Sequence, residues 1–261
     1  MRIALGLEYL GTSFTGWQSQ PDGRGVQDAL ERALAIIAGE RIGTHAAGRT
    51  DAGVHATMQV VHFDTAVQRP DAAWIRGVNS QLPQAIAVQW AQPVADDFHA
   101  RFAAMARHYT YLLVSRPVRP ALLAGRIGWY HRPLDVAAMS EAARALAGTH
   151  DFSAFRAAGC QAKSAVKTLT SVAVARSGEH VLFDFSANAF LHHMIRNIVG
   201  ALVYVGAGKE SAAWIGEVLA GRDRTLAAPT FAADGLYLTG ADYDAKWGLP
   251  PTRRPVALPL A

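Results

Sequence analysis

The sequence of 261 residues is nearly free of cysteine, with Cys160 as its single example. One thiol excludes an intrachain disulfide and any metal site built from several cysteines, so a reducing compartment is expected. Long apolar runs are also missing, because no window offers about 18 uncharged apolar residues for a membrane helix. Glu8 interrupts the apolar residues that follow Met1, which is unlike a signal peptide. The sequence therefore predicts a cytoplasmic protein.

Acidic residues are absent from one long stretch, between Phe98 and Leu134. The same stretch contains Arg101, Arg107, Arg116, Arg119, Arg126 and Arg132. The formal net charge of the whole chain is +4 and the pI is about 9.4. A stretch of one sign attracts polyanions and speeds their capture, although a solvated basic face without a partner has the same pattern. The charge distribution favours a nucleic-acid partner without establishing one.

Alternating apolar residues predict strands, and apolar residues at helical spacing predict helices. The predicted strands cover residues 3–9, 58–63, 86–90, 108–114, 168–174, 181–185 and 236–239. The predicted helices cover residues 26–37, 136–147, 190–205 and 212–219. Strands and helices follow one another in mixed order, and residues 177–180 are suited to a hairpin turn. This order predicts an α+β fold with mixed, mainly antiparallel sheets that helices cover on one face.

Two α/β halves are expected, because the pattern of strands and helices restarts after the basic stretch. The boundary falls near Ala106, so that residues 1–106 form an N-terminal half and residues 107–261 a C-terminal half. A cleft between two such halves is a common place for a ligand.

The segment from Gly48 to His55 concentrates the residues that can carry chemistry. Gly48 and Gly53 permit a tight loop, and Arg49 stands two positions from Asp51. A guanidinium at that distance would favour ionised Asp51 and orient it, and His55 adds a possible proton carrier. The same residues would also suit a structural turn with an Arg–Asp pair and a surface histidine. The loop alone does not decide between these readings.

Several further segments accompany this loop, and their order along the chain is informative. They are residues 9–18, 48–56, 98–102, 107–111, 151–156, 188–200 and 235–238. In this order, and over nearly the whole length, the sequence resembles the bacterial tRNA pseudouridine synthase A family, which modifies the anticodon stem-loop. One such segment would be weak evidence, whereas the ordered series is highly specific.

The resemblance implies a role for four residues. Asp51 is similar to the family's catalytic aspartate, Arg49 to its partner in the site, and Tyr109 to the residue stacked on the target uracil. Leu236 stands where the family lines the base pocket with an apolar residue. Asp51 would then belong to the N-terminal half, with Tyr109 and the pocket wall in the C-terminal half.

The resemblance also implies an architecture and a substrate. The two halves would join across a central basic cleft, with helices on the outer face, and the protein would form a homodimer. The substrate would be tRNA, at uridines about positions 38, 39 and 40, and neither a cofactor nor a metal would be used.

Pseudouridine formation suits these residue types. The N1–C1′ bond breaks, the uracil rotates, and it is rejoined through C5. An ionised Asp51 could attack C1′ or remove the C2′ proton, and the sequence does not choose between the two. Tyr109 and Leu236 could hold the turning base, while Arg49 could fill the space from which the base was flipped.

Other residues leave alternatives open. His192 and His193 lie on a predicted helix and are expected to point in different directions, in packing or RNA contact rather than metal ligation. His108 and Thr110 flank Tyr109 where relatives often have arginine, which would weaken phosphate contacts or move them to Arg107 and Arg101.

A non-catalytic RNA-binding module is one alternative function. A hydrolase with Asp51 as nucleophile and His55 as base is another.

Overall fold

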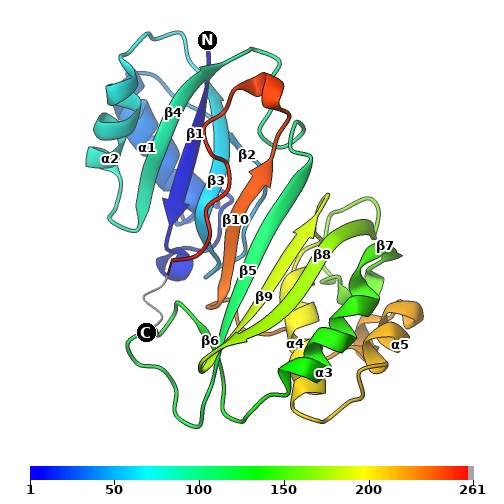
Figure 1. Ribbon diagram of the computed structural model, residues 1–261. Helices are drawn as coiled ribbons and strands as arrows, with labels where there is room; N and C mark the ends of the chain where they lie inside the picture. Colours follow the sequence, from blue (N-terminus) through cyan, green and yellow to red (C-terminus); the bar gives the residue numbers. More distant parts are fainter. Residues whose placement is uncertain (258–261) are drawn as a thin grey trace. The chain divides into compact units, whose positions relative to one another are not determined.

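A computed structural model describes residues 1–257 of the chain (Figure 1). The chain separates into two compact units. The first contains Met1–Arg107 and the chain from Tyr237 on, and the second is His108–Leu236. The predicted division near Ala106 assigned everything after it to one half. In the structure the chain leaves the first unit after Arg107 and returns to it at Tyr237. Residues 258–261 of the predicted C-terminal half lie outside the described part.

The first unit is built on a sheet of long strands with alternating burial. Its strands are β1 (Arg2–Tyr9), β2 (Thr44–Ala46), β3 (His55–Asp64), β4 (Ile86–Val94) and β10 (Leu236–Asp242, from Tyr237 on). β1 pairs antiparallel with β3 and β4, and β2 pairs antiparallel with β3. β10 runs parallel to β3, with Tyr237 opposite His55. Strands were predicted at β1, β3, β4 and β10, and these predictions are confirmed.

Both faces of this sheet are covered, because its residues alternate between two cores. Ile3 and Phe63 are paired and fully buried, and the Phe63 ring packs on Trp74 at 5.2 Å. Trp74 belongs to the helical segment η2 (Ala73–Gly77). η2 and the following α2 (Val78–Gln81) both pack with α1 (Val26–Ala38). The opposite face buries Ala4, Val60, Phe98, Ala100 and Ala241 in a second cluster. Gly39 ends α1 with a φ of 72°, a conformation that glycine adopts without strain.

The second unit is a sheet with helices packed against it (Figure 1). Its strands are β5 (Ala106–Ser115, from His108 on), β6 (Gly128–Tyr130), β7 (Gly148–Asp151), β8 (Val166–Ser177) and β9 (His180–Ala187). The strand order is β5-β9-β8-β7, with β6 parallel to β5. β8 and β9 form the predicted hairpin, in which Ser177 is opposite His180 and Gly178 has a φ of 58°.

The helices of this unit are α3 (Val136–Ala143), α4 (Met194–Gly206) and α5 (Trp214–Gly221). Short 3-10 turns accompany them at Arg144–Leu146, Ser153–Phe155 and Arg224–Leu226. α3 packs on both β8 and α4. The start predicted for α4, at residue 190, is wrong because His193 has a φ of 61°, which a right-handed helix excludes.

Antiparallel pairs dominate in both units, and parallel pairs join β10 to β3 and β6 to β5. The predicted α+β class with mixed, mainly antiparallel sheets is confirmed. Within residues 1–257, no helix combines the length and the apolar character that crossing a membrane requires.

Candidate active site

The Asp-bearing loop Gly48–Gly53 connects β2 to β3, and its backbone is anchored at several points. The Trp17 N–H donates to the Thr50 carbonyl at 3.0 Å, and the Thr50 hydroxyl bonds the Tyr9 hydroxyl at 2.8 Å. The Gln59 amide donates to the Gly48 carbonyl at 2.6 Å. Thr50 and Tyr9 are buried, so these bonds lie beneath the loop and leave Asp51 at its surface.

Two glycines let the segment that follows β1 approach this loop. A Cβ at Gly11 would lie 2.0 Å from the Val54 carbonyl oxygen. A Cβ at Gly16 would lie 2.7 Å from the Thr50 carbonyl oxygen, and Gly16 has a φ of 103°. Only glycine allows this conformation together with such close backbone contact. The segment of residues 9–18 that the sequence singled out therefore supports the Asp-bearing loop.

Asp51 is half-buried, whereas Arg49 is exposed. In the described part of the chain, no ion pair or hydrogen bond joins the Arg49 guanidinium to Asp51. The two side chains share a loop without the pairing that the sequence suggested. Arg49 is accordingly available to solvent or to a ligand.

His55 is not the surface histidine that the sequence suggested, since it is 1% exposed at the start of β3. Its Nδ1 accepts the Gly11 N–H at 2.9 Å, and its ring lies 4.6 Å from the Tyr237 ring. A ring nitrogen that holds a buried backbone N–H is unsuited to take a proton from water. The position of His55 therefore argues against a hydrolase that uses it as a base.

Tyr109 and Leu236 belong to the second unit, and both are largely buried, at 8% and 5% exposure. The Tyr109 ring meets the Phe190 ring edge-on, with centroids 5.1 Å apart. The Leu236 N–H donates to the Ala233 carbonyl at 2.8 Å. The preceding Gly235 accepts the Leu112 N–H at 2.8 Å, which holds the start of β10 against β5 within this unit.

The polar residues that flank Tyr109 are occupied in the sheet. His108 Nδ1 bonds the Ser186 hydroxyl at 2.8 Å, and the Thr110 hydroxyl donates to Asp184 at 2.6 Å. Both are buried on β5 and connect it to β9. The two side chains thus link β5 to β9.

His192 and His193 lie in the turn before α4, and their ring centroids are 4.0 Å apart. The prediction that they point in different directions is wrong, because it assumed a regular helix at these positions. The His192 N–H also approaches the Cys160 sulfur at 3.4 Å.

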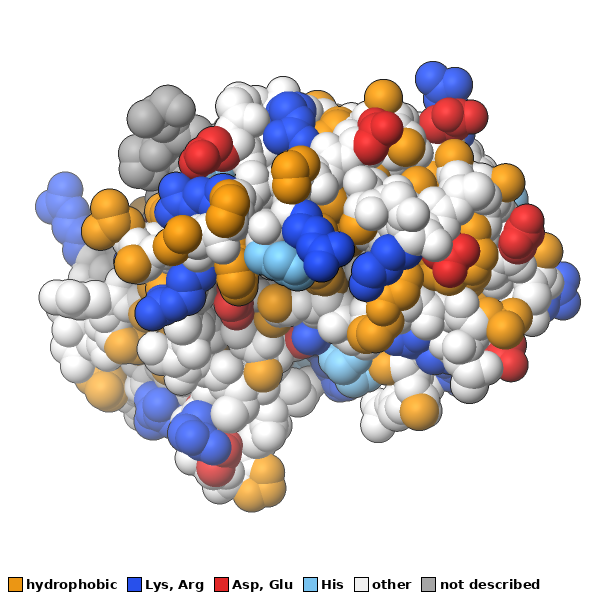
Figure 2. All heavy atoms as spheres, turned by 90° about the horizontal axis from the view of Figure 1, so that it is seen from below, with side chains coloured by type: hydrophobic (Ala, Val, Ile, Leu, Met, Phe, Trp, Pro, Cys, Tyr) orange, Lys and Arg blue, Asp and Glu red, His pale blue; other side chains and the backbone are white. Residues whose placement is uncertain are grey.

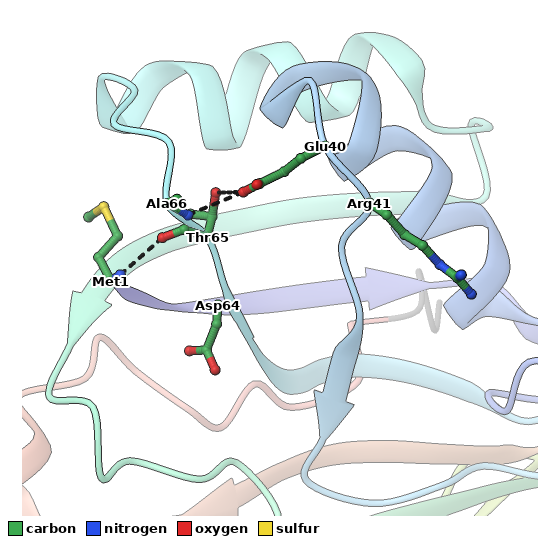
Figure 3. A pocket seen from close by; sticks show the side chains of 6 residues that line it. All are labelled: Met1, Glu40, Arg41, Asp64, Thr65 and Ala66. Carbon is green, nitrogen blue, oxygen red and sulfur yellow. Dashed lines mark hydrogen bonds between the residues drawn. The ribbon is translucent and has the colours of Figure 1, made fainter.

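A pocket of about 340 Å³ lies elsewhere in the first unit (Figure 3). Its lining is Met1, Glu40, Arg41, Asp64, Thr65 and Ala66. The N-terminal amine donates to the Thr65 carbonyl at 2.9 Å, and the Thr65 hydroxyl donates to Glu40 at 2.5 Å. Asp64 ends β3, whereas the Asp-bearing loop precedes its start at His55. Because a ten-residue strand spans about 30 Å, the pocket is remote from Asp51.

The family model described as tRNA pseudouridine synthase matches residues 7–103 and 142–244 of this chain. These segments include Arg49, Asp51 and Leu236, whereas Tyr109 lies between them. Among solved structures, a chain in the crystal structure of a Cbf5-Nop10-Gar1 complex matches 90% of this chain and 48% of its own. Its sequence identity is 13% and its TM-score is 0.36, a similarity too low to support any inference.

Curated relatives match far more closely. The tRNA pseudouridine synthase A of Aromatoleum aromaticum is 62% identical over 259 residues, 99% of this chain and 98% of the relative. That of Chromobacterium violaceum is 62% identical over 251 residues, 96% of each chain. That of Dechloromonas aromatica is 60% identical over 250 residues, 96% of this chain and 95% of the relative.

These matches, together with the α+β fold, define an isomerase. The chain belongs to the tRNA pseudouridine synthase family, as its resemblance in sequence indicated.

Proposed function

We propose that this protein converts uridine to pseudouridine in the anticodon stem-loop of tRNA, about positions 38, 39 and 40, with Asp51 as the reacting carboxylate. The observation that carries the proposal is the presentation of Asp51. It is half-buried on a loop whose backbone is anchored through Gly48 and Thr50, within a segment that the family model matches. The proposed reaction uses no cofactor, because its steps need only a carboxylate and the transfer of protons.

The reaction places one demand on Asp51, which is that it be ionised. In one route its oxygen attacks C1′, the N1–C1′ bond breaks, and uracil leaves as an anion while a ribosyl ester forms. In the other, Asp51 removes the C2′ proton as the same bond breaks, which yields a glycal. In both, the freed uracil turns and C5 bonds to C1′, which breaks the Asp51 ester in the first route and is accompanied by return of a proton to C2′ in the second. The C5 proton is then lost, while N1 gains one. The partial exposure of Asp51 is compatible with either route.

The other three residues are assigned supporting roles. Tyr109 stacks on the uracil, and its edge-on contact with Phe190 restricts the orientation of its ring. Leu236 provides an apolar wall at the start of β10, where the bond from Leu236 to Ala233 fixes the backbone. Arg49 is exposed and unpaired with Asp51, so it can enter the space that the flipped base leaves and contact phosphate.

We further propose that the protein acts on cytoplasmic tRNA as a homodimer, in which one subunit positions the tRNA body while its partner modifies the base. The support is the resemblance to the family together with the high identity to its members. Sedimentation of the free protein tests the dimer, and a single species with the mass of one chain would overturn it.

The activity is tested with unmodified tRNA that carries tritium at uracil C5. Pseudouridylation releases this tritium to water, and we expect release by the wild-type protein but not by Asp51→Asn. The exposed acid Asp71, elsewhere in the first unit, offers a matched control, and Asp71→Asn should retain full release. Transcripts in which only position 38, 39 or 40 bears the label would locate the modified uridine.

Each result bears on a different part of the proposal. Wild-type protein that releases no tritium from any of these transcripts would overturn the proposed function. An Asp51→Asn variant with full release would remove Asp51 from the chemistry. Uracil found free in solution would indicate hydrolysis of the glycosidic bond instead of isomerisation.

A further inference from the structure

The turn that follows β4, residues Phe98–Ala104, presents an aromatic side chain and a cation that the proposed chemistry does not use. Phe102 is 75% exposed, and Arg101 is exposed beside it. The guanidinium carbon of Arg101 lies 5.7 Å from the centroid of the Phe102 ring. Within residues 1–257, this ring is the only side-chain partner of the Arg101 guanidinium. Its donors are therefore available to a ligand.

The backbone of this turn is held rigidly from inside. Phe98 is fully buried, and its ring packs on Tyr243 at 5.5 Å and on Trp247 at 5.3 Å. The Ala100 N–H donates to His62 Nδ1 at 3.1 Å, while the Ala100 carbonyl accepts the Tyr243 hydroxyl at 2.6 Å. Both polar groups of a buried residue are thus satisfied. The turn presents its exposed side chains from a preorganised base, which lowers the entropy lost on binding.

His99 stabilises the turn from the other side. Its Nδ1 accepts the N–H groups of Arg101 at 3.2 Å and Phe102 at 3.4 Å. Its ring lies 4.3 Å from the Phe102 ring and 4.6 Å from the His62 ring. Burial, together with the nearby charges of His45 and Arg2, lowers the pKa of His99. At neutral pH the imidazole therefore supports Phe102 as an uncharged ring, and Arg101 provides the positive charge.

Arg107 connects the turn to the Asp-bearing loop. Its guanidinium donates to the Ala104 carbonyl at 2.9 Å, to the Ala47 carbonyl at 3.0 and 3.2 Å, and also to the Arg101 carbonyl. Ala47 directly precedes Gly48, the first residue of that loop, and four residues extend at most about 14 Å. Asp51 therefore lies within that reach of a residue bound to the turn, inside the first unit.

We propose that Phe102 stacks on an unpaired base of the tRNA substrate and that Arg101 contacts the neighbouring phosphodiester. The inference rests on the proposed function, because tRNA is taken as the ligand. Exposed aromatic rings flanked by arginine bind single-stranded nucleotides by stacking and by charge. Asp96 and Asp97 precede the turn, whereas the chain that follows it favours a polyanion, since it has no acidic residue between Phe98 and Leu134. Figure 2 views the molecule from below Figure 1, away from the end of β4 that leads into this turn, and on that face too Lys and Arg side chains lie among apolar ones.

A second copy of the chain fits this turn less well. The large exposed apolar side chains in and directly after the turn are Phe102 and Met105, which are 75% and 57% exposed. Stable interfaces between proteins bury about 1,200–2,000 Å², more than two side chains provide. One aromatic ring with one cation is enough for a single stacked nucleotide.

The experiment measures the affinity of the full-length protein for unmodified tRNA by fluorescence anisotropy. Phe102→Ala and Phe102→Leu should each weaken binding about tenfold, because neither side chain stacks, while Phe102→Trp should stay within about twofold of wild type. Arg101→Gln should lower the slope of log affinity against log salt by about one, the amount expected for one lost phosphate contact.

Two control variants match these changes in exposure and charge. Ile36 is 62% exposed on α1, and Ile36→Ala should leave affinity unchanged. Arg76 is exposed on η2, and Arg76→Gln should leave the salt slope unchanged. Thermal unfolding checks that every variant is folded. If Phe102→Ala is unstable, the comparison of Phe102→Leu with Phe102→Trp still tests whether an aromatic ring is needed for binding.

Three outcomes would overturn the inference. Phe102→Ala could bind tRNA as tightly as Ile36→Ala, or Phe102→Leu could bind as well as wild type. Sedimentation could instead show that wild-type protein is a dimer and Phe102→Ala a single chain, while tRNA affinity is kept. That result would assign the turn to the contact with a second copy. Failure of the proposed function is recognised separately, because wild-type protein would then release no tritium.

Discussion

The hydrogen bond between Thr50 and Tyr9 offers a direct test of how the Asp-bearing loop is positioned. Thr50 is 7% exposed and immediately precedes Asp51, and its hydroxyl lies 2.8 Å from that of Tyr9. Burial raises the pKa of the Tyr9 phenol, so the hydroxyl remains protonated throughout the physiological range. Thr50→Val replaces the hydroxyl with a methyl group of nearly the same size and removes this bond without opening a cavity.

The expected size of the effect follows from the burial of the bond. A buried hydrogen bond contributes about 1 kcal/mol net, and a hydroxyl left without its partner costs about 1–3 kcal/mol. The Gln59 side chain lies near the Tyr9 hydroxyl, and its buried Oε1 has no partner within the described residues. The Tyr9 hydroxyl can turn toward it, which places Thr50→Val near the lower end of this range. If the loss appears as displacement of Asp51, about 1.4 kcal/mol corresponds to a tenfold fall in kcat. We expect kcat to fall about tenfold, with KM for tRNA nearly unchanged.

The assay is tritium release at saturating tRNA for a set of related variants. Thr50→Ser restores the hydroxyl and should recover kcat to within about twofold of wild type, and Tyr9→Phe should resemble Thr50→Val. The double variant should be no worse than the poorer single one, because both changes remove the same bond. Full kcat in Thr50→Val would refute the reasoning, as would additive losses in the double variant. A Thr50→Ser variant as slow as Thr50→Val would assign the effect to the lost methyl group.

Two further predictions concern stability. Burial, followed by the nearby charges of His99 and Arg2, lowers the pKa of His62 from 6.5 to about 3. The contribution of His62 to the free energy of unfolding is therefore complete above pH 6.5 and is lost as pH falls toward 3. Between these values the free energy of unfolding falls by at most about 1.4 kcal/mol per pH unit. Urea unfolding between pH 7 and pH 4 should show this slope, and it should flatten in His62→Gln; an unchanged slope would contradict the assignment. Gly16→Ala should lower the free energy of unfolding by at least about 1 kcal/mol, because its φ is 103° and its Cβ would meet the Thr50 carbonyl. A Cβ at Gly43 meets nothing within 4 Å, so a thermal melt of Gly43→Ala should match wild type, and equal melting of both variants would be inconsistent with the clash.

Local patterns predicted most elements of this fold. Alternation identified β1 and β9, and helical spacing identified α1, because the faces of a strand or helix are set by neighbouring residues. The start of α4 was missed because His193 is left-handed, a conformation uncommon for any residue other than glycine. Nothing in the adjacent sequence signals that departure.

The candidate site also has some features that the sequence predicted and others that it did not. The glycines around Asp51 and the ordered segments indicated the loop and the family from sequence alone. The burial of His55 was not predictable, since it depends on Gly11 and Tyr237, which lie 44 and 182 positions away. The expected pairing of Arg49 with Asp51 is also absent from the described residues, in which the Arg49 side chain is exposed.

The sequence by itself determined the α+β class, most strands and helices, and the identity of the Asp-bearing segment, because these depend on residue spacing along the chain. Only the tertiary structure decided that Leu236 and Tyr237 belong to different units, and that Thr50 anchors the loop through Tyr9. It also decided that Arg101 and Phe102 project from a turn that Arg107 ties to Ala47. These features join residues remote in sequence, and such contacts are set by the packing of the whole chain rather than by local preference.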